Sequence, residues 1–337
     1  MISQKEITIL RELIDQNHTF VLTTHVNPDG DALGSEITMA KYLEHLGKQV
    51  YIINNSPTPY NYEFLDPKKE IIVYDEAQHA DLISSADIYI ILDISDWERL
   101  RKIGEIIQQS PVPKICIDHH HINRKFADID IIYEAASSTG ELVYEFLTQI
   151  NYPIAGESAR ALYTCILTDT GSFRFSNTTE TTHDMASELI KAGVNGRELY
   201  NLVYEQNSRT KMALMGEALS NLHYECDGQL VWFTLTQAMF NKHNASHWDT
   251  EGFPEIPRTI IGVEVSLMFT ELSGDKVKVS LRSKGKIVIG NVAEMLGGGG
   301  HNFAAGALVR KNLAETIPMV LEKTKQLVES AAIPKTS

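Results

Sequence analysis

The stretch FVLTTHVNPDGDALG, residues 20–34, decides the fold. It begins with an apolar run typical of a buried strand, turns at Pro28 and Gly30, and continues from Ala32 in a helical pattern. The same alternation of strand-like run and helical pattern continues to about Ile117, in FVLTTH (20–25), 32–47, QVYIIN (49–54), IIV (71–73), DIYIILD (87–93), 97–109 and KICID (114–118). Such alternation predicts βαβ units and a parallel sheet.

The rhythm changes near residues 209–221, after helical patterns at 138–149 and 156–168 and a largely helical stretch at 180–220. Strand candidates then follow one another across turn signals, at 222–226, 230–235, 261–270 and 276–282, before two further helical stretches. A chain of 337 residues also exceeds what one core usually organises. We therefore predict an α/β protein with a mostly parallel N-terminal sheet flanked by helices, a smaller C-terminal mixed α/β domain, and a cleft between them. The expected boundaries are 1–190, a helical connector at 191–221, and 222–337.

Composition restricts the classes of partner. A net charge of −14 argues against binding of long duplex nucleic acid, because such binding needs a basic surface. It does not argue against a small phosphorylated substrate. The three cysteines form no CxxC pair, the N-terminus does not read as a signal peptide, and no apolar run approaches the roughly 20 residues of a membrane span. We expect a cytoplasmic protein with no membrane partner. The oligomeric state stays open, a homodimer included.

Acidic and imidazole side chains recur where the predicted elements end. His25, Asp29 and Asp31 follow the first strand, Asp93 ends a later one, and the run Asp118, His119, His120, His121 ends another. Asp169 ends a predicted helix, directly before Thr170 and Gly171. Because ligands bind at the carboxyl ends of strands in an open parallel sheet, we expect these groups to converge.

Each motif alone has a simpler structural explanation. An Asx-rich turn with a helix cap at Asp31 accounts for the first, a strand terminator for Asp93, and a solvated turn for the three histidines. An ordinary helix end explains Asp169 less well, since an acid near a helix C-terminus opposes the macrodipole. The recurrence of all four in one predicted domain favours a common site.

The chemistry of the donor set predicts metal binding. Oxygen ligands combined with imidazoles favour Mn²⁺, with Mg²⁺ or Co²⁺ as alternatives, and the number of carboxylates predicts two divalent ions rather than one. Two ions about 3.5–4 Å apart can activate a water and stabilise charge on phosphate oxygens. The predicted chemistry is therefore hydrolysis of a phosphoester.

A further motif lies in the second domain, where Gly297–Gly300 precede His301. Glycines let backbone N–H groups approach an anion closely, and His301 can donate to a phosphate or ribose. Arg282 and Lys284 upstream supply the cations that such a pocket needs. A flexible hinge is the alternative explanation of the glycine run.

In this order, HVNPDGDALGS, ILD, IDHH and LTDTGSF, with GGGGHNFAAGA near the C-terminus, resemble the motifs of the DHH phosphoesterase superfamily. The resemblance covers essentially the whole chain. The glycine-histidine block with RSKG is similar to the C-terminal DHH-associated domain of the NrnA-type branch, which comprises nanoRNases and 3′-phosphoadenosine 5′-phosphate (PAP) phosphatases.

The resemblance implies roles for individual residues. One metal would be held by His25, Asp29 and Asp93, and the other by Asp31, Asp93, His119 and Asp169, so that Asp93 bridges them. His120 would face the substrate phosphate as a candidate general acid, with its neighbour Asp118 orienting the imidazole. The implied substrate-binding residues are Arg282, His301, Gly299, Gly300, Arg258 and Ser138.

The implied function is metal-dependent hydrolysis of short single-stranded oligoribonucleotides, such as nanoRNA and pApA-type dinucleotides, to mononucleotides, and of PAP to AMP. A pyrophosphatase or polyphosphatase is one alternative. A non-catalytic nucleotide sensor is another, although a sensor has no physical need for six metal-binding side chains.

Overall fold

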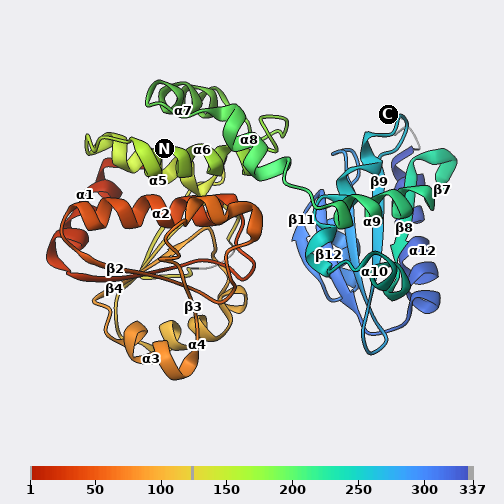
Figure 1. The fold of residues 1–337 in the computed structure, drawn as a ribbon, viewed down its shortest axis with the longest axis horizontal. Coiled ribbons are helices and arrows are strands. Elements are labelled where there is room, and N and C mark those ends of the chain that lie inside the picture. Colours follow the sequence, from red (N-terminus) through yellow and green to blue (C-terminus); the bar gives the residue numbers. More distant parts are fainter. Residues whose placement is uncertain (1, 123–124, 333–337) are drawn as a thin grey trace. The chain divides into compact units, whose positions relative to one another are not determined.

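The computed structural model describes residues 2–122 and 125–332. The chain divides into two compact units between Gln206 and Asn207, and each unit is built around a six-stranded sheet (Figure 1). The two sheets differ in strand direction, so each unit is described separately.

The sheet of the first unit is parallel throughout the described residues. Its strand order is β3 (Ile72–Val73), β2 (Gln49–Asn54), β1 (Thr19–Thr23), β4 (Ile88–Leu92), β5 (Lys114–Asp118), β6 (Ile129–Ile132). The chain starts at β1, runs outward to β3, and then crosses to β4 on the other side of β1. The strand order therefore reverses between β1 and β4, and ligands bind at the carboxyl ends of strands around such a switch point.

Helices cover both faces of this sheet (Figure 1). One face carries α1 (Gln4–Gln16), α2 (Gly30–His45), α5 (Thr139–Gln149) and α6 (Gly156–Asp169), and the other carries α3 (Glu76–Ser84) and α4 (Arg101–Gln109). Alternate strand residues supply the two cores: Phe20 and Leu22 pack with α2, and Val21 with α4. Two further helices, α7 (Glu180–Lys191) and α8 (Gly196–Tyr204), pack on α6.

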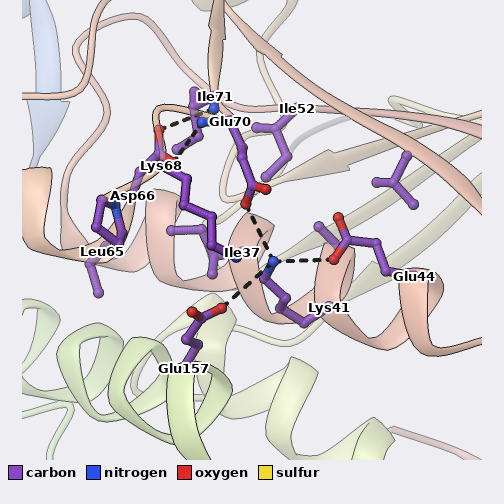
Figure 2. Close-up of a pocket in the computed structure, with 13 residues that line it drawn as sticks. Ile37, Lys41, Glu44, Ile52, Leu65, Asp66, Lys68, Glu70, Ile71 and Glu157 are labelled. Carbon is purple, nitrogen blue, oxygen red and sulfur yellow. Dashed lines mark hydrogen bonds and ion pairs between the residues drawn. The ribbon is translucent and has the colours of Figure 1, made fainter.

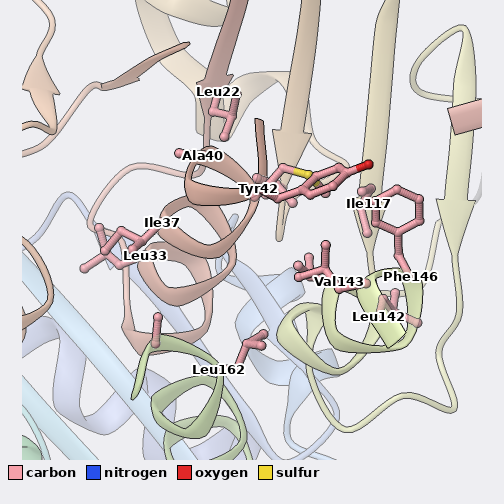
Figure 3. Packing of buried hydrophobic residues seen from close by; sticks show 14 of the residues in the cluster. Leu22, Leu33, Ile37, Ala40, Tyr42, Ile117, Leu142, Val143, Phe146 and Leu162 are labelled. Carbon is pink, nitrogen blue, oxygen red and sulfur yellow. The ribbon is translucent and has the colours of Figure 1, made fainter. Parts of the chain in front are cut away.

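The helices α2, α5 and α6 contribute Leu33, Phe146 and Leu162 to one buried hydrophobic cluster (Figure 3). A Cβ at Gly34 of α2 would lie 2.4 Å from the Sγ of Cys165 in α6. Glycine is therefore required for α2 to lie this close to α6, and this contact sets the distance between the acidic residues that the two helices carry.

The second unit has a mixed sheet in the order β11 (Gly299–His301), β12 (Ala304–Val309), β10 (Lys276–Ser283), β9 (Val265–Leu272), β8 (Leu230–Leu235), β7 (His223–Glu225). Among the described strands of this second sheet, only β8 and β9 pair in parallel. Its helices are α9 (Arg209–Ser220), α10 (Gln237–His243), α11 (Gly290–Met295) and α12 (Leu313–Ala332). Short 3₁₀ turns at Phe253–Glu255 and Pro257–Thr259 precede β9.

The predicted fold class is confirmed, with a mostly parallel sheet first and a mixed sheet second. Of the stretch expected as a helical connector, α8 lies in the first unit and α9 in the second. The hairpin β11–β12 and the strand β6 were not predicted. Within 2–122 and 125–332, no helix is both long and apolar enough to cross a membrane.

Candidate metal centre

Six predicted side chains converge at the carboxyl edge of the parallel sheet. His25 follows β1, Asp93 follows β4, and His119 follows β5. The other three are Asp29 and Asp31 at the start of α2 and Asp169 at the end of α6. Their ligand atoms form two groups, each within 4.8 Å: His25, Asp29, Asp93 and Asp31, His119, Asp169. Asp93 also forms such a group with His119 and His120, so it lies between the two sets.

The first group is arranged around the Nε2 atom of His25. This nitrogen lies 3.5 Å from Oδ2 of Asp93 and 3.9 Å from Oδ2 of Asp29. Two atoms that each lie about 2.1 Å from one ion are about 3 to 3.5 Å apart. The spacing of these donors therefore fits a shared divalent cation closely enough for small side-chain adjustments to complete the site.

The second group surrounds the Nε2 atom of His119. This atom lies 3.4 Å from Oδ2 of Asp169, 3.8 Å from Oδ2 of Asp31 and 3.7 Å from Oδ1 of Asp93. It is buried and makes no hydrogen bond within the described part of the chain. Buried polar atoms normally have a hydrogen-bond partner. A buried imidazole nitrogen without one, facing three carboxylate oxygens, has the surroundings expected of a metal ligand.

Backbone donors hold Asp31 in place. The N–H groups of Thr139 and Gly140, at the start of α5, donate to its two oxygens at 2.7 and 2.8 Å, and a helix N-terminus favours such an anion. The hydroxyl of Thr139 also donates to Oδ1 of Asp93 at 3.0 Å. The structure places the predicted substrate residue Ser138 beside them, fully buried, where its hydroxyl caps α5 by accepting from the N–H of Glu141.

The turn before α2 has the expected Asx character, but the cap falls at Asp29 rather than at Asp31. Oδ1 of Asp29 accepts from the N–H groups of Asp31 and Ala32, both at 3.1 Å, because α2 already begins at Gly30. Its other oxygen, Oδ2, faces His25. Asp29 therefore caps the helix and remains available as a ligand.

The cluster is electrostatically unfavourable by itself. Burial and the carboxylates around it raise the pKa of Asp93 well above its usual range, and burial together with Asp31 does the same for Asp169. Burial lowers the pKa of His25. For His119, burial acts in the same direction, but Asp169 and Asp31 outweigh it and raise the pKa. Bound divalent cations would offset this concentration of negative charge.

Asp118 and His120 form a separate pair beside the cluster. Oδ1 of Asp118 lies 2.7 Å from Nδ1 of His120 and accepts from the N–H groups of His119 and His120. Burial raises the pKa of Asp118, but its hydrogen bonds with His120 and Ser95 outweigh burial and lower it. The carboxylate thus fixes the orientation of the His120 ring. His121 lies apart, largely exposed and paired with Glu134.

In the second unit the predicted anion-binding residues lie around the end of β10. Nε of Arg282 donates to Glu255, and Nη1 of Arg258 donates to the carbonyl of Ser283 at 2.6 Å. Gly299 and Gly300 belong to β11, where the register pairs His301 with Ala304, the residue that also pairs with Arg282. The side chain of His301 lies outside the described residues.

Comparison with known proteins shows the family of this chain. Residues 19–168 match the N-terminal domain of the DHH family, and residues 201–330 match the DHHA1 domain. A bifunctional oligoribonuclease and PAP phosphatase NrnA from Thermus thermophilus is 30% identical over 311 residues, which cover 90% of this chain and 89% of the relative. The chain belongs to the DHH phosphoesterase family. It is by family a hydrolase of phosphoester bonds.

Solved structures share the DHH architecture. An exopolyphosphatase-related protein from Bacteroides fragilis superposes with a TM-score of 0.93 at 32% identity, covering 98% of this chain and 99% of that one. The exonuclease RecJ bound to manganese superposes with a TM-score of 0.53 at 12% identity, covering 99% and 96%. The second likeness shows the common fold alone.

A small pocket elsewhere in the DHH domain has a structural explanation. It has a volume of about 40 Å³ and contains none of the six convergent side chains. Figure 2 shows Lys41 of α2 at its centre, with Nζ 3.1 Å from Glu44, 3.4 Å from Glu70 and 3.6 Å from Glu157. These ion pairs join α2 to the turn before β3 and to the start of α6.

Proposed function

We propose that this DHH phosphoesterase uses two divalent ions, Mn²⁺ in the first place, to hydrolyse short oligoribonucleotides to mononucleotides and PAP to AMP. The observation that carries the proposal is the pair of ligand groups on either side of Asp93. The NrnA relative, named for both activities, and the manganese of RecJ support the choice of substrate and ion. The cysteines Cys116, Cys165 and Cys226 are unpaired, which supports action in the cytoplasm.

One ion would be held by His25, Asp29 and Asp93, and the other by Asp31, His119 and Asp169 together with Asp93. Two ions at such a site supply an activated water and stabilise the charge on the phosphate oxygens. The protein's own contribution is to hold the ligand atoms in place. The N–H groups of Thr139 and Gly140 donate to Asp31, and Asp29 is fixed by accepting from the N–H of Asp31 as the cap of α2.

His120 is our candidate proton donor to the leaving oxygen. It is partly exposed at the edge of the cluster, 3.7 Å from Asp93, and Asp118 holds its Nδ1 side. In this role Asp118 is a positioning residue, because it acts on the substrate only through the ring of His120.

Arg282, Arg258, His301, Gly299 and Gly300 would recognise the phosphate of the nucleotide beyond the scissile bond. The sheet register supports this set, since Arg282 and His301 flank Ala304 on neighbouring strands. Recognition of a terminal phosphate favours short substrates, because a longer chain places its terminus farther from the scissile bond. The net charge of −14 also opposes the binding of long nucleic acid.

Polyphosphate hydrolysis is a second candidate, favoured by the name of the Bacteroides fragilis structure, an exopolyphosphatase-related protein with 32% identity. The two proposals differ in whether the substrate needs a nucleoside. They also make different demands on chain length, because polyphosphate is a long repetitive anion.

A hydrolysis panel distinguishes these functions. Mn²⁺-loaded protein would be given RNA from dimers to long chains, pApA, PAP, pyrophosphate and polyphosphate, with Asp93→Ala as the control. We expect preferential cleavage of the short RNAs, pApA and PAP, abolished in the variant. Turnover of polyphosphate or pyrophosphate alone would favour the alternative hydrolases, and no turnover with any divalent metal would favour a nucleotide sensor.

A further inference from the structure

The segment that follows Asp169 has an unusual backbone. Three consecutive residues, Gly171, Ser172 and Phe173, have positive φ angles of 55°, 61° and 63°. Glycine adopts this left-handed conformation readily, but serine and phenylalanine do so at a conformational cost. Such strain persists only where the surroundings enforce it, and it is concentrated at ligand-binding sites.

Several hydrogen bonds enforce this conformation. The carbonyl of the buried Thr170 accepts from the N–H groups of Arg174 and Phe175 at 2.9 and 3.0 Å, and its hydroxyl accepts from the N–H of Phe173 at 2.9 Å. The side chain of Asn177 donates to the carbonyl of Asp169 at 3.1 Å and to that of Ser137 at 2.9 Å. The segment is thus fixed both to a candidate metal ligand and to the turn that precedes α5.

The two phenylalanines of this segment have opposite environments. Phe173 is turned inward, where its ring stacks on His183 with the centroids 5.3 Å apart. Phe175 is 45% exposed, and its ring lies over Gly171, since a Cβ at Gly171 would come within 2.4 Å of its Cζ atom. Gly171 is two residues beyond Asp169, so the strained turn holds an exposed aromatic ring close to the metal centre.

Arg174 adds positive charge beside this ring. Its Nε donates to the carbonyl of Gly171 at 2.6 Å, and its guanidinium carbon lies over one face of the Phe175 ring, 5.9 Å from the centroid. Both side chains are exposed. Although the protein has a net charge of −14, Arg174 therefore offers a local positive charge to an anionic ligand at this position. An aromatic face next to a guanidinium is a combination that binds nucleotides by stacking and charge.

We propose that Phe175 and Arg174 form a nucleoside subsite, in which the base next to the scissile phosphate stacks on Phe175 while Arg174 attracts the adjoining phosphate. The inference rests on the proposed function. The proposed substrates, short oligoribonucleotides and PAP, all carry a nucleobase, whereas the alternative substrates, pyrophosphate and polyphosphate, do not. Stacking accepts every base, because each has a π-face, so the subsite selects for nucleotides without selecting a sequence.

Steady-state hydrolysis of pApA by Phe175→Leu and Phe175→Tyr tests the subsite, with Tyr224→Leu as the control at an exposed aromatic of the second unit. We expect Phe175→Leu to raise KM about tenfold with a smaller change in kcat, and Phe175→Tyr and Tyr224→Leu to leave KM nearly unchanged. The same kinetics on an abasic analogue of pApA should show no effect of Phe175→Leu. An unchanged KM for pApA, or an equal loss on the abasic analogue, would overturn the proposal.

Calorimetric binding of AMP and of ribose 5-phosphate separates this inference from the proposed function, because it needs no turnover. Wild-type protein should bind AMP about tenfold more tightly than Phe175→Leu does, while the affinity for ribose 5-phosphate stays the same. Equal affinities of the two proteins for AMP would refute the subsite even if pApA is cleaved. Failure of wild-type protein to cleave any nucleotide would refute the proposed function, whatever the binding result.

Discussion

Asp93 has a tightly constrained environment among the six convergent residues. It is buried, has a φ of 59°, accepts from the hydroxyl of Thr139, and lies between the imidazoles of His25 and His119. Its pKa is raised because burial and the neighbouring carboxylates disfavour its ionised form. Ionising Asp93 is therefore unfavourable in metal-free protein, whereas a bound cation would favour the ionised form.

Asp93→Asn should accordingly have opposite effects on stability in the two states. In chelator, the variant should melt at or above the temperature of the wild type, because an amide replaces a buried acid whose ionised form is disfavoured among the other carboxylates. Saturating Mn²⁺ should stabilise the wild type by about 2.7 kcal/mol at a hundredfold excess over Kd and stabilise the variant far less. Hydrolysis by the variant should fall by more than about 100-fold.

Thermal unfolding with and without Mn²⁺ checks this prediction. Asp81→Asn, an exposed acid in α3, is the matched control and should respond to Mn²⁺ as the wild type does. Equal stabilisation of Asp93→Asn and wild type by Mn²⁺ would show that Asp93 is not a metal ligand.

At the residue scale, the six convergent side chains could be predicted because acids and imidazoles after apolar strands have few structural uses. The N–H groups of Thr139 and Gly140 on Asp31 could not, since every residue except proline has a backbone donor and the sequence does not show where it points. The role of Asp29 as the cap of α2 was missed because both Asp29 and Asp31 suit a helix start.

Among the helices, the close contact of α2 with α6 fixes the spacing of Asp31 and Asp169. Gly34→Ala would place a methyl group 2.4 Å from the Sγ of Cys165, so the two helices would have to separate. We expect a loss of about 1–3 kcal/mol in the free energy of unfolding, together with weaker Mn²⁺ binding.

Gly216→Ala in α9 is the matched control for this substitution, because among the described residues no atom outside its chain neighbours and its own helix backbone lies within 4 Å of the added Cβ. It should be neutral or stabilise the protein by up to about 1 kcal/mol, through helix propensity. Urea denaturation measures both variants. Equal unfolding free energies for Gly34→Ala and the wild type would show that the contact is not close enough to set the spacing.

A buried pair between α2 and β2 supports the end of β1. The side-chain amide of Asn54 donates to Glu36 at 2.8 Å, and its oxygen accepts from the N–H of Thr24, the residue before His25, at 3.2 Å. Burial raises the pKa of Glu36 to about 8. In folded protein this carboxyl therefore stays protonated through neutral pH.

The raised pKa predicts how stability depends on pH. Between the ordinary pKa of 4.5 and about 8, the folded protein keeps a proton on Glu36 that the unfolded chain releases. This group's contribution to stability is therefore complete below pH 4.5 and declines as pH rises, by up to about 1.4 kcal/mol per pH unit. Glu36→Gln removes the decline, because an amide does not titrate.

Chemical denaturation of Mn²⁺-loaded wild type and Glu36→Gln near pH 5.5 and pH 8 measures the difference. The variant should gain stability relative to the wild type as the pH rises. Parallel stability curves would contradict a raised pKa for Glu36.

At the element scale, the sequence predicted the strands whose apolar runs are uninterrupted. QVYIIN and KICID correspond to β2 and β5 residue for residue. The strand β6 was missed because acids interrupt its apolar residues in DIDII, and β11 because a glycine run has a low strand propensity and gains its order from pairing with β12.

Over the whole molecule, the candidate chemistry and the candidate recognition residues belong to different units. The candidate metal ligands lie in the first unit, and Arg282 lies in the second, within the stretch that matches the DHHA1 domain. The change in sequence rhythm predicted two domains, because a parallel and a mixed sheet have different patterns of strands and turns. It could not show that Arg282 pairs with Glu255, since that contact joins β10 to a short 3₁₀ turn distant in sequence.

Arg282→Ala should therefore weaken discrimination between short and long RNA. Loss of a charged contact to the terminal phosphate costs about 1.5–3 kcal/mol, so KM for RNA dimers should rise by about 10- to 150-fold while long RNA is little affected. Arg310→Ala, at an exposed position after β12, is the control and should keep the profile of the wild type. An unaltered chain-length profile for Arg282→Ala would exclude this role.

The central claim, two ions held on either side of Asp93, is tested most directly by anomalous diffraction from crystals grown with Mn²⁺. We predict two anomalous peaks about 3.5–4 Å apart, one beside His25 and Asp29 and the other beside His119 and Asp169. A single peak, or none among these side chains at saturating Mn²⁺, would contradict the account.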